Sequence, residues 1–296
     1  MSEIKDPTPD QPACCIVIGM AGSGKTTLMK KISNYMTYNG KNAYVVNLDP
    51  AVSSLPYVPN IDIRDTVDYK GVMKDFNLGP NGSIMTSLNL FATRFDQVLD
   101  FIDKRSSENE FVFLFVILIS SVVLIDTPGQ IEVFTWSASG SIITESLSSS
   151  LPTVLLYVVD TPRSSQPITF MSNMLYACSI MYRMRLPMVI VFNKVDIQDC
   201  STIEDWMRDY EAFQNVVSED RSDSFMIPLT RSMGLVLDEF YNTMRTVGVS
   251  SVTGEGMGDL EAAIQDAKEE YFSVFLPMIQ VGGECKNPIT RRKIAA

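Results

Sequence analysis

Residues 19–26 read GMAGSGKT, which fits the phosphate-binding pattern G-x-x-x-x-G-K-[ST]. An apolar run, Cys14 to Ile18, precedes this stretch, and helical periodicity is expected from Lys25 to Tyr38. A strand that enters a glycine-rich turn and leaves it as a helix directs backbone N–H groups at a phosphate, at the helix end where the macrodipole favours anions. The stretch therefore predicts a nucleotide-binding P-loop, and a chance glycine-rich turn is the weaker interpretation.

The polar groups of this loop have distinct expected tasks. Lys25 would bridge the β- and γ-phosphates, and the Thr26 hydroxyl would coordinate Mg²⁺. Backbone N–H groups from Ala21 to Thr26 would surround the β-phosphate. The residues expected to contact the nucleotide from this loop are Gly22, Ser23, Gly24, Lys25, Thr26 and Thr27.

A second motif, DTPGQ at residues 126–130, follows another apolar run. Asp126 stands where a Walker-B carboxylate holds magnesium, usually through water. Gly129 could supply an N–H for the γ-phosphate, and Gln130 is a candidate for orienting the attacking water. The same string could be an ordinary turn after a strand, but its position downstream of a P-loop favours the nucleotide site.

A third motif, NKVD at residues 193–196, can read guanine. The Asp196 carboxylate can accept hydrogen bonds from N1–H and the N2 amino group of guanine, and adenine would leave it unpaired. A solvated turn after a strand is the alternative. The string SSVTG at 250–254 is a weaker signal that could add backbone N–H groups to the base pocket. The residues expected there are Asn193, Lys194 with its stem over the base plane, Asp196, Ser251 and Val252.

Composition narrows the function further. The 296 residues carry a formal net charge of −11, which argues against nonspecific nucleic-acid binding. The chain has no histidine, which removes histidine-based triads and histidine-ligated zinc. Five cysteines without C-x-x-C spacing indicate free thiols in a reducing compartment. We expect a cytoplasmic protein.

Apolar runs alternate with helical periodicity along the chain, which predicts an α/β fold with a mostly parallel sheet covered by helices on both faces. Two short helices are expected to bury one face each, at positions 69, 72, 73 and 76 and at positions 95, 98, 99 and 102. The expected division is a disordered leader over 1–12, one domain over 13–275 and a basic tail over 276–296. The runs expected to form strands after the first are Ala43 to Leu48, Val122 to Ile125, Thr153 to Val159 and Met188 to Phe192.

The segment Phe111 to Ile125 is unusual because it is almost wholly apolar. It falls short of the roughly 20 residues that a membrane helix needs, and its β-branched and aromatic content favours a strand. We expect an extended or doubled buried strand and no membrane contact. An insertion error in the gene sequence is the alternative, since Val122 to Asp126 would suffice.

The chain resembles the GPN-loop GTPases, which have the three-layer P-loop NTPase fold with a GPN-loop insertion. The resemblance covers nearly everything from Cys14 to Tyr271. WSASG at 136–140 is most similar to the branch of the family that acts in RNA polymerase II assembly and nuclear import. The strings that carry the resemblance are GPN at 79–81, DTPGQIE at 126–132, NKVD at 193–196, NLDPAV at 47–52, TSLNLF at 86–91 and FMSNMLYAC at 170–178.

The resemblance implies a magnesium-dependent GTPase that forms a dimer with itself or with a paralogous GPN-loop GTPase. Asn81 would then face the phosphates of the opposite subunit, as an arginine finger does elsewhere. Asp49 would activate the attacking water and help to hold the metal, with Gln130 and Glu132 in supporting roles. Asp65 would lie in a nucleotide-sensitive switch. RNA polymerase II subunits are the implied clients, with shuttling between cytoplasm and nucleus.

Simpler interpretations remain open for several of these residues. The string at 79–82 is a good β-turn sequence, and Glu132 could be a first-turn carboxylate favoured by a helix dipole. Arg64 and Asp65 could be a solvated ion pair of little energetic weight. A methionine-rich helix expected from Thr169 to Arg185 could be core or, in part, a dimer contact.

Two other classes of function also remain. One is a P-loop kinase that phosphorylates a nucleotide or polynucleotide, and the NKVD string weighs against it. The other is a GTP-dependent scaffold with little turnover.

Overall fold

The computed structural model describes residues 7–107, 120–219, 240–241 and 244–277. At its centre lies a seven-stranded sheet in the order β3-β2-β4-β1-β5-β6-β7, and every neighbouring pair is parallel. The strands are β1 (Ala13–Gly19), β2 (Asn42–Asn47), β3 (Ile61–Asp62), β4 (Ser120–Asp126), β5 (Thr153–Asp160), β6 (Met188–Asn193) and β7 (Arg245–Val249).

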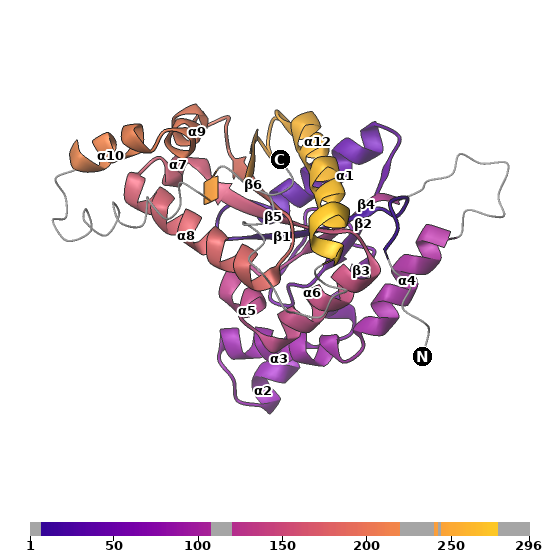
Figure 1. Cartoon of the computed structure of the whole chain (residues 1–296). Helices are drawn as coiled ribbons and strands as arrows, with labels where there is room; N and C mark the ends of the chain where they lie inside the picture. Colours follow the sequence, from indigo (N-terminus) through magenta and orange to yellow (C-terminus); the bar gives the residue numbers. More distant parts are fainter. Residues whose placement is uncertain (1–6, 108–119, 220–239, 242–243, 278–296) are drawn as a thin grey trace.

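Helices cover both faces of this sheet, as the sequence predicts (Figure 1). The helices before β5 are α1 (Lys25–Tyr38), α2 (Tyr69–Asp75), α3 (Pro80–Ala92), α4 (Phe95–Ser107), α5 (Ile131–Thr135) and α6 (Ala138–Ser150). Those after β5 are α7 (Thr161–Ser164), α8 (Pro167–Met184), α9 (Ser201–Arg208), α10 (Tyr210–Glu219) and α12 (Met257–Glu270). A 3₁₀ turn, Ile63–Asp65, follows β3, and a π-helical turn, Tyr271–Phe275, follows α12.

Strand β1 explains the three layers. All seven of its residues are buried, and because successive side chains point to opposite faces, the strand feeds two cores. Cys14, Ile16 and Ile18 join the core under α3, α4, α6 and α8. Cys15 and Val17 join the core under α1 and α12. An apolar run without alternation is therefore the signature of a strand buried on both sides.

Strand β1 also creates the place for a ligand. The chain runs from β1 through α1 to β2 on one side of the sheet, and it later passes from β4 to β5 across β1. The connection after β1 therefore leads toward β2 on one side of the sheet, and the connection after β5 leads toward β6 on the other. Where two such connections diverge, a crevice opens at the carboxyl ends of the strands.

Most expected elements are present with small shifts of their bounds. Helix α1 has the predicted bounds, and Phe95, Val98 and Ile102 bury one face of α4 as expected. The prediction that Phe76 belongs to the buried face of α2 is wrong, because the helix ends at Asp75 and Phe76 is 60% exposed.

The unusual apolar segment is described only in part. Its end forms β4, which pairs with β1 and β2. Residues 108–119 lie outside the described part, so the expectation of a longer strand and the alternative of an inserted stretch are both open there. Among the described helices, none is long and apolar enough to cross a membrane.

The expected leader and tail also fall largely outside the description, so the domain division stays a prediction. Residues 7–12 are described and turn back on themselves, with Gln11 N–H donating to the Thr8 carbonyl over 3.1 Å. The Lys268 ammonium donates to the Pro9 carbonyl over 2.6 Å. This short stretch is therefore held against α12.

The methionine-rich helix α8 is mainly a core element. Met171 and Met174 are buried, whereas Tyr182 is 57% exposed.

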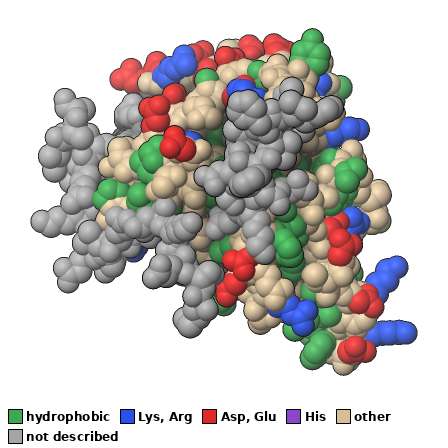
Figure 2. Space-filling model, turned by 90° about the vertical axis from the view of Figure 1, so that its right-hand side faces the viewer, with side chains coloured by type: hydrophobic (Ala, Val, Ile, Leu, Met, Phe, Trp, Pro, Cys, Tyr) green, Lys and Arg blue, Asp and Glu red, His purple; other side chains and the backbone are tan. Residues whose placement is uncertain are grey.

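Figure 2 shows acidic side chains gathered along the upper edge of one face of the molecule, with lysine and arginine side chains scattered singly over the part of this face that the described residues form. The four described cysteines are free thiols.

Candidate functional site

The three motifs meet at one edge of the sheet because they follow parallel strands. The P-loop follows β1, DTPGQ overlaps and follows the end of β4, and NKVD begins at the end of β6. In the sheet, Val17 pairs with Asp126 and Asp160 pairs with Asn193. Sequence segments more than 100 residues apart are thereby brought side by side.

The P-loop holds its lysine in a buried position. Lys25 is 5% exposed, and its ammonium donates to the carbonyls of Gly19 over 2.7 Å and Met20 over 3.2 Å. A longer contact of 3.5 Å reaches the Gly129 carbonyl. Burial lowers the pKa of Lys25, and the nearby carboxylates of Asp126 and Asp49 partly oppose this shift. A cation held this way is placed for phosphate oxygens that approach the loop.

Glycine is required at position 24. Its φ is +91°, a conformation that L side chains rarely adopt, and a Cβ there would lie 2.4 Å from the amide nitrogen of Asn193. The loop therefore touches the NKVD motif directly. Ser23 is buried, and its carbonyl accepts a hydrogen bond from the Asn193 amide. At the start of α1, Thr26 is half-buried and Thr27 is exposed.

Asp126 has the character of a metal carboxylate. It is 2% exposed, and among the described residues its Oδ1 accepts no hydrogen bond. Burial raises the pKa of Asp126 to about 6, against the opposing effects of the Tyr57 hydroxyl, Lys25 and the Thr26 hydroxyl. An unpartnered buried carboxylate oxygen beside a threonine hydroxyl suits Mg²⁺, which prefers oxygen ligands. The residues present therefore fit this ion.

Asp49 lies beside the second motif. Its Oδ2 accepts from the Gly129 N–H over 3.2 Å, and its Oδ1 accepts from the Ala51 N–H over 2.9 Å. The Leu48 N–H, one residue earlier, donates to the Asp126 carbonyl over 2.9 Å. The structure thus brings Asp49, Gly129 and Lys25 into one cluster.

Asn193 is a brace between loops. It is fully buried, and its amide nitrogen donates to the Ser23 carbonyl over 2.8 Å. Its Oδ1 accepts from the Ser251 hydroxyl over 2.7 Å and from the Ser251 N–H over 3.2 Å. One side chain therefore joins the P-loop, the NKVD motif and the SSVTG loop.

Asp196 is exposed and remains open to a ligand. The Ser250 hydroxyl donates to its Oδ1 over 2.6 Å, which fixes the carboxylate. Among the described residues, no hydrogen bond engages Oδ2, so this oxygen can face a purine. The Val252 N–H donates to the Ser250 hydroxyl over 3.3 Å, and Val252 itself is 74% exposed. Contacts of Ser251 and Val252 with a base stay a prediction.

Lys194 crosses from β6 to the P-loop. Its backbone has a φ of +71°, which is uncommon for a residue other than glycine. Its ammonium donates to the Gly22 carbonyl over 2.9 Å and to Asp160 Oδ2 over 2.8 Å. Asp160 was not predicted as a site residue, because only the pairing of β5 with β6 places it beside this lysine. Tyr57, whose hydroxyl donates to Asp126, was not predicted either, since no local sequence pattern indicates a role for these two residues.

The GPN string begins a helix and is not the β-turn that its composition allowed. Gly79 caps α3, Pro80 is the first helical residue, and Asn81 is exposed on the first turn. Gln130 precedes α5 and is exposed, as is Glu132 in the first turn of that helix. The contacts among the three motifs do not include Asn81.

Arg64 does not form the solvated pair with Asp65 that the sequence allowed. Its guanidinium binds Asp62 instead, with Nη2 at 2.6 Å from Oδ2 and Nε at 3.0 Å from Oδ1. Arg64 Nη1 also donates to the Val52 carbonyl over 3.1 Å. Asp62 is close enough because its side chain caps the 3₁₀ turn that contains Arg64.

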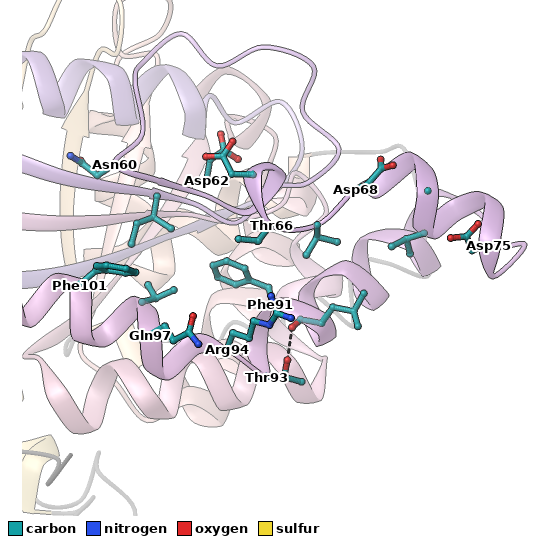
Figure 3. Close-up of a pocket in the computed structure, with 17 residues that line it drawn as sticks. Asn60, Asp62, Thr66, Asp68, Asp75, Phe91, Thr93, Arg94, Gln97 and Phe101 are labelled. Atoms are coloured by element: carbon teal, nitrogen blue, oxygen red, sulfur yellow. Dashed lines mark hydrogen bonds between the residues drawn. The ribbon is translucent and has the colours of Figure 1, made fainter. Parts of the chain in front are cut away.

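A separate cavity of about 570 Å³ lies between β3 and helices α2 to α4 (Figure 3). Its wall combines acidic side chains, including Asp68 and Asp75, with the aromatic rings of Phe91 and Phe101. The expected switch residue Asp65 also lines it. None of the P-loop or NKVD residues lines this cavity.

The chain is similar to a family described as a conserved hypothetical ATP binding protein, over residues 17–270. It is 57% identical over 265 residues to GPN-loop GTPase 1 of Dictyostelium discoideum, covering 90% of this chain and 64% of that protein. It is 32% identical over 247 residues to GPN-loop GTPase PAB0955 of Pyrococcus abyssi, covering 83% of this chain and 93% of that protein.

The crystal structure of the Pyrococcus abyssi GTPase PAB0955 in its apo form is also similar. It superposes with a TM-score of 0.72 at 27% identity, over 90% of this chain and 99% of that chain. The chain spans 64% of the length of GPN-loop GTPase 1 of Dictyostelium discoideum and 65% of that of GPN-loop GTPase QQT2 of Arabidopsis thaliana, about two thirds of each.

Proposed function

Because this chain belongs to the GPN-loop GTPase family, we propose that it binds GTP with Mg²⁺ and hydrolyses GTP to GDP and phosphate. The observation that carries the proposal is the brace made by Asn193, which seats the NKVD motif directly on the P-loop. A base read by Asp196 and a phosphate chain held by Lys25 then belong to the same ligand.

The proposed chemistry is attack of water on the γ-phosphate. Asp49 has a carboxylate beside Gly129 and serves as the group that orients the water and accepts its proton. Lys25 and the Gly129 N–H stabilise charge on the γ-phosphate oxygens. Thr26 and Asp126 would hold Mg²⁺, which supplies further neutralisation of the phosphate charge. Gln130 and Glu132 assist from the start of α5.

Guanine, rather than adenine, is the proposed base, although the matched family description mentions ATP. The exposed Asp196 carboxylate suits the two donors on guanine, and adenine offers no such pair. Calorimetry with GTP and with ATP, each with Mg²⁺, tests this choice. Binding of GTP but not of ATP supports the choice of guanine, and equal binding heats with both nucleotides would contradict it.

Hydrolysis needs its own test, since a kinase or a scaffold could bind GTP equally well. GTP labelled at the γ-phosphate should release free labelled phosphate and leave no labelled acceptor. The Asp49→Asn variant should keep its affinity for GTP and lose most of the single-turnover rate. A wild-type rate in this variant would remove Asp49 from the proposed mechanism.

We further propose that the protein works as a dimer, with Asn81 entering the site of the other subunit. In support, Asn81 is exposed on the first turn of α3 and is absent from the contacts among this chain's own motifs. The partner is a second copy or a paralogous GPN-loop GTPase.

Mixing two inactive variants tests the exchange of Asn81 in a homodimer. Lys25→Ala removes the variant's own phosphate site, and Asn81→Ala removes what it lends to its partner. An equal mixture should recover about a quarter of the wild-type rate, because half of the dimers are mixed and each has one complete site. A mixture as inactive as its parts would contradict the exchange.

The proposed cellular role is a switch in RNA polymerase II assembly and nuclear import, with shuttling between cytoplasm and nucleus. WSASG at 136–140, which suggests this branch of the family, caps α6 in the structure, where the Gly140 N–H donates to the Ser137 hydroxyl over 3.0 Å. Trp136 remains 46% exposed, with the Arg183 guanidinium 4.9 Å from its ring centre. Affinity purification with GDP or a non-hydrolysable GTP analogue should recover polymerase subunits in one nucleotide state only.

A further inference from the structure

Tyr57 links a surface loop to the carboxylate proposed for the metal. The loop joins the end of β2 at Asn47 to the start of β3 at Ile61. The Tyr57 hydroxyl donates to Asp126 Oδ2 over 2.5 Å, while its ring packs against the core under α1. The next residue, Val58, is 89% exposed, so the side chains of these two neighbours point in different directions, Tyr57 toward the core and Val58 toward solvent.

The two oxygens of Asp126 have different surroundings. Oδ2 is held by the phenol, and Oδ1 is buried without a hydrogen-bond partner among the described residues. A donor on one oxygen fixes the rotation of a carboxylate and leaves the other oxygen for a metal or its bound water. The Tyr57 hydroxyl is a donor at neutral pH, because an ordinary tyrosine loses its proton only near pH 10.

We propose that Tyr57 is the positioning residue for the magnesium carboxylate, and that its hydrogen bond ties the order of the loop over 50–60 to metal binding. The proposal rests on the magnesium-dependent GTP site proposed above. Tyr57 acts through Asp126 and keeps its bond to Oδ2 when the metal occupies the site.

The contacts of the loop over 50–60 explain how metal binding at Asp126 can change its order. It starts next to Asp49, whose Oδ1 accepts from the Ala51 N–H, and it ends at Asn60, which exchanges hydrogen bonds with the backbone of Val45. Its first half is held at Val52, whose carbonyl accepts from Arg64. Within the described structure, Tyr57 supplies the side-chain hydrogen bond from the second half of the loop to the site. A metal ion that fixes the Asp126 carboxylate therefore also orders the second half of the loop, through Tyr57.

The Tyr57→Phe variant tests the proposal, because it keeps the ring and removes the hydroxyl. We expect the concentration of Mg²⁺ needed to saturate the GDP complex to rise about tenfold, the lower end of the usual effect of losing a partner of a metal ligand. Affinity for GDP in EDTA should change less than twofold, since the Tyr57 hydroxyl donates to Asp126 and not to a residue of the P-loop. Calorimetry measures both quantities without reference to turnover.

Hydrogen exchange over residues 50–60 gives the second measurement. In the wild-type protein, Mg²⁺ should slow exchange there, and in Tyr57→Phe this slowing should disappear. Tyr38→Phe is the matched control, since Tyr38 is 90% exposed at the end of α1 and should behave as wild type.

An unchanged magnesium requirement in Tyr57→Phe, or loop protection by Mg²⁺ that survives the substitution, would overturn the proposal. Failure of the wild-type protein to bind GTP with Mg²⁺ would instead overturn the proposed function, so the two failures are distinguishable.

Discussion

The Asn193 amide donates a hydrogen bond to the Ser23 carbonyl over 2.8 Å, joining two loops that stand 170 positions apart. The contact is fully buried, and the same side chain accepts from both the hydroxyl and the N–H of Ser251. The residue that a sequence motif assigns to nucleotide binding thus also builds the frame of the site. Its substitution should affect folding and binding together.

Asn193→Asp should lower the free energy of unfolding by about 1–3 kcal/mol, because a carboxylate oxygen would face the Ser23 carbonyl where a donor stood. GTP affinity should fall with it, since the P-loop loses its brace. Urea unfolding and calorimetry measure the two effects. Asn60→Asp is the control, since it keeps the oxygen that accepts from the Val45 N–H, and it should retain GTP affinity. Stable Asn193→Asp protein with wild-type affinity would contradict the bracing role.

Asp196→Asn should change which base the protein accepts. An amide cannot receive both guanine donors, so GTP affinity should fall by a factor on the order of 100 or more. The same amide can donate to the C2 carbonyl of xanthine, and XTP should gain affinity. Competition binding with GTP, XTP and ATP measures the change. Asp199→Asn, at an exposed residue whose carboxylate accepts from Ser201 outside the NKVD motif, should leave the preference intact.

Gly24→Ala should abolish nucleotide binding. The added methyl group would lie 2.4 Å from the Asn193 amide, at a backbone φ of +91°. Gly40→Ala is the matched control, because its φ is +71° but nothing lies within 4 Å of the added methyl group. The control should cost about 1 kcal/mol of stability from backbone strain and keep full binding. Equal behaviour of the two variants in thermal denaturation and calorimetry would argue against a clash at position 24.

The stability of the protein should fall in acid partly through Asp62. Burial raises the pKa of this carboxyl, but hydrogen bonds from the Arg64 side chain and backbone and from Asn47 outweigh burial and leave the pKa below its usual value. A lowered pKa in the folded state means that the stabilisation is present above about pH 4, the value for an unfolded chain, and is lost as pH falls through the folded pKa.

Asp62→Asn should therefore lose less stability than wild type between pH 5 and pH 3, two values that bracket the unfolded pKa of about 3.9. Urea unfolding at several pH values gives the slope. Arg64→Gln should reduce the slope as well, since Asp62 loses its ion-pair partner. Wild-type slopes in both variants would show that this pair does not govern the acid transition.

The sequence predicted much of this fold from local rules. The run at Cys14 to Ile18 had to be buried on both sides because it lacks polar alternation, and the glycine at position 24 required a turn before a helix. Helix α1 followed from periodicity alone. The end of α2 did not, because Phe76 continues the helical period in the sequence, although the helix ends at Asp75 and the chain turns at Asn77, where φ is +49°.

By itself, then, the sequence determined the α/β class, the P-loop and the order of the three motifs, since each depends on residues close together in the chain. Only the tertiary structure decided that Asn193 braces Ser23, that Asp160 holds Lys194, that Arg64 binds Asp62, and that Tyr57 reaches Asp126. A hydrogen bond needs two atoms within about 3 Å, and this distance is set by which parallel strands become neighbours and by how their loops fold back. No local pattern in the chain specifies that arrangement.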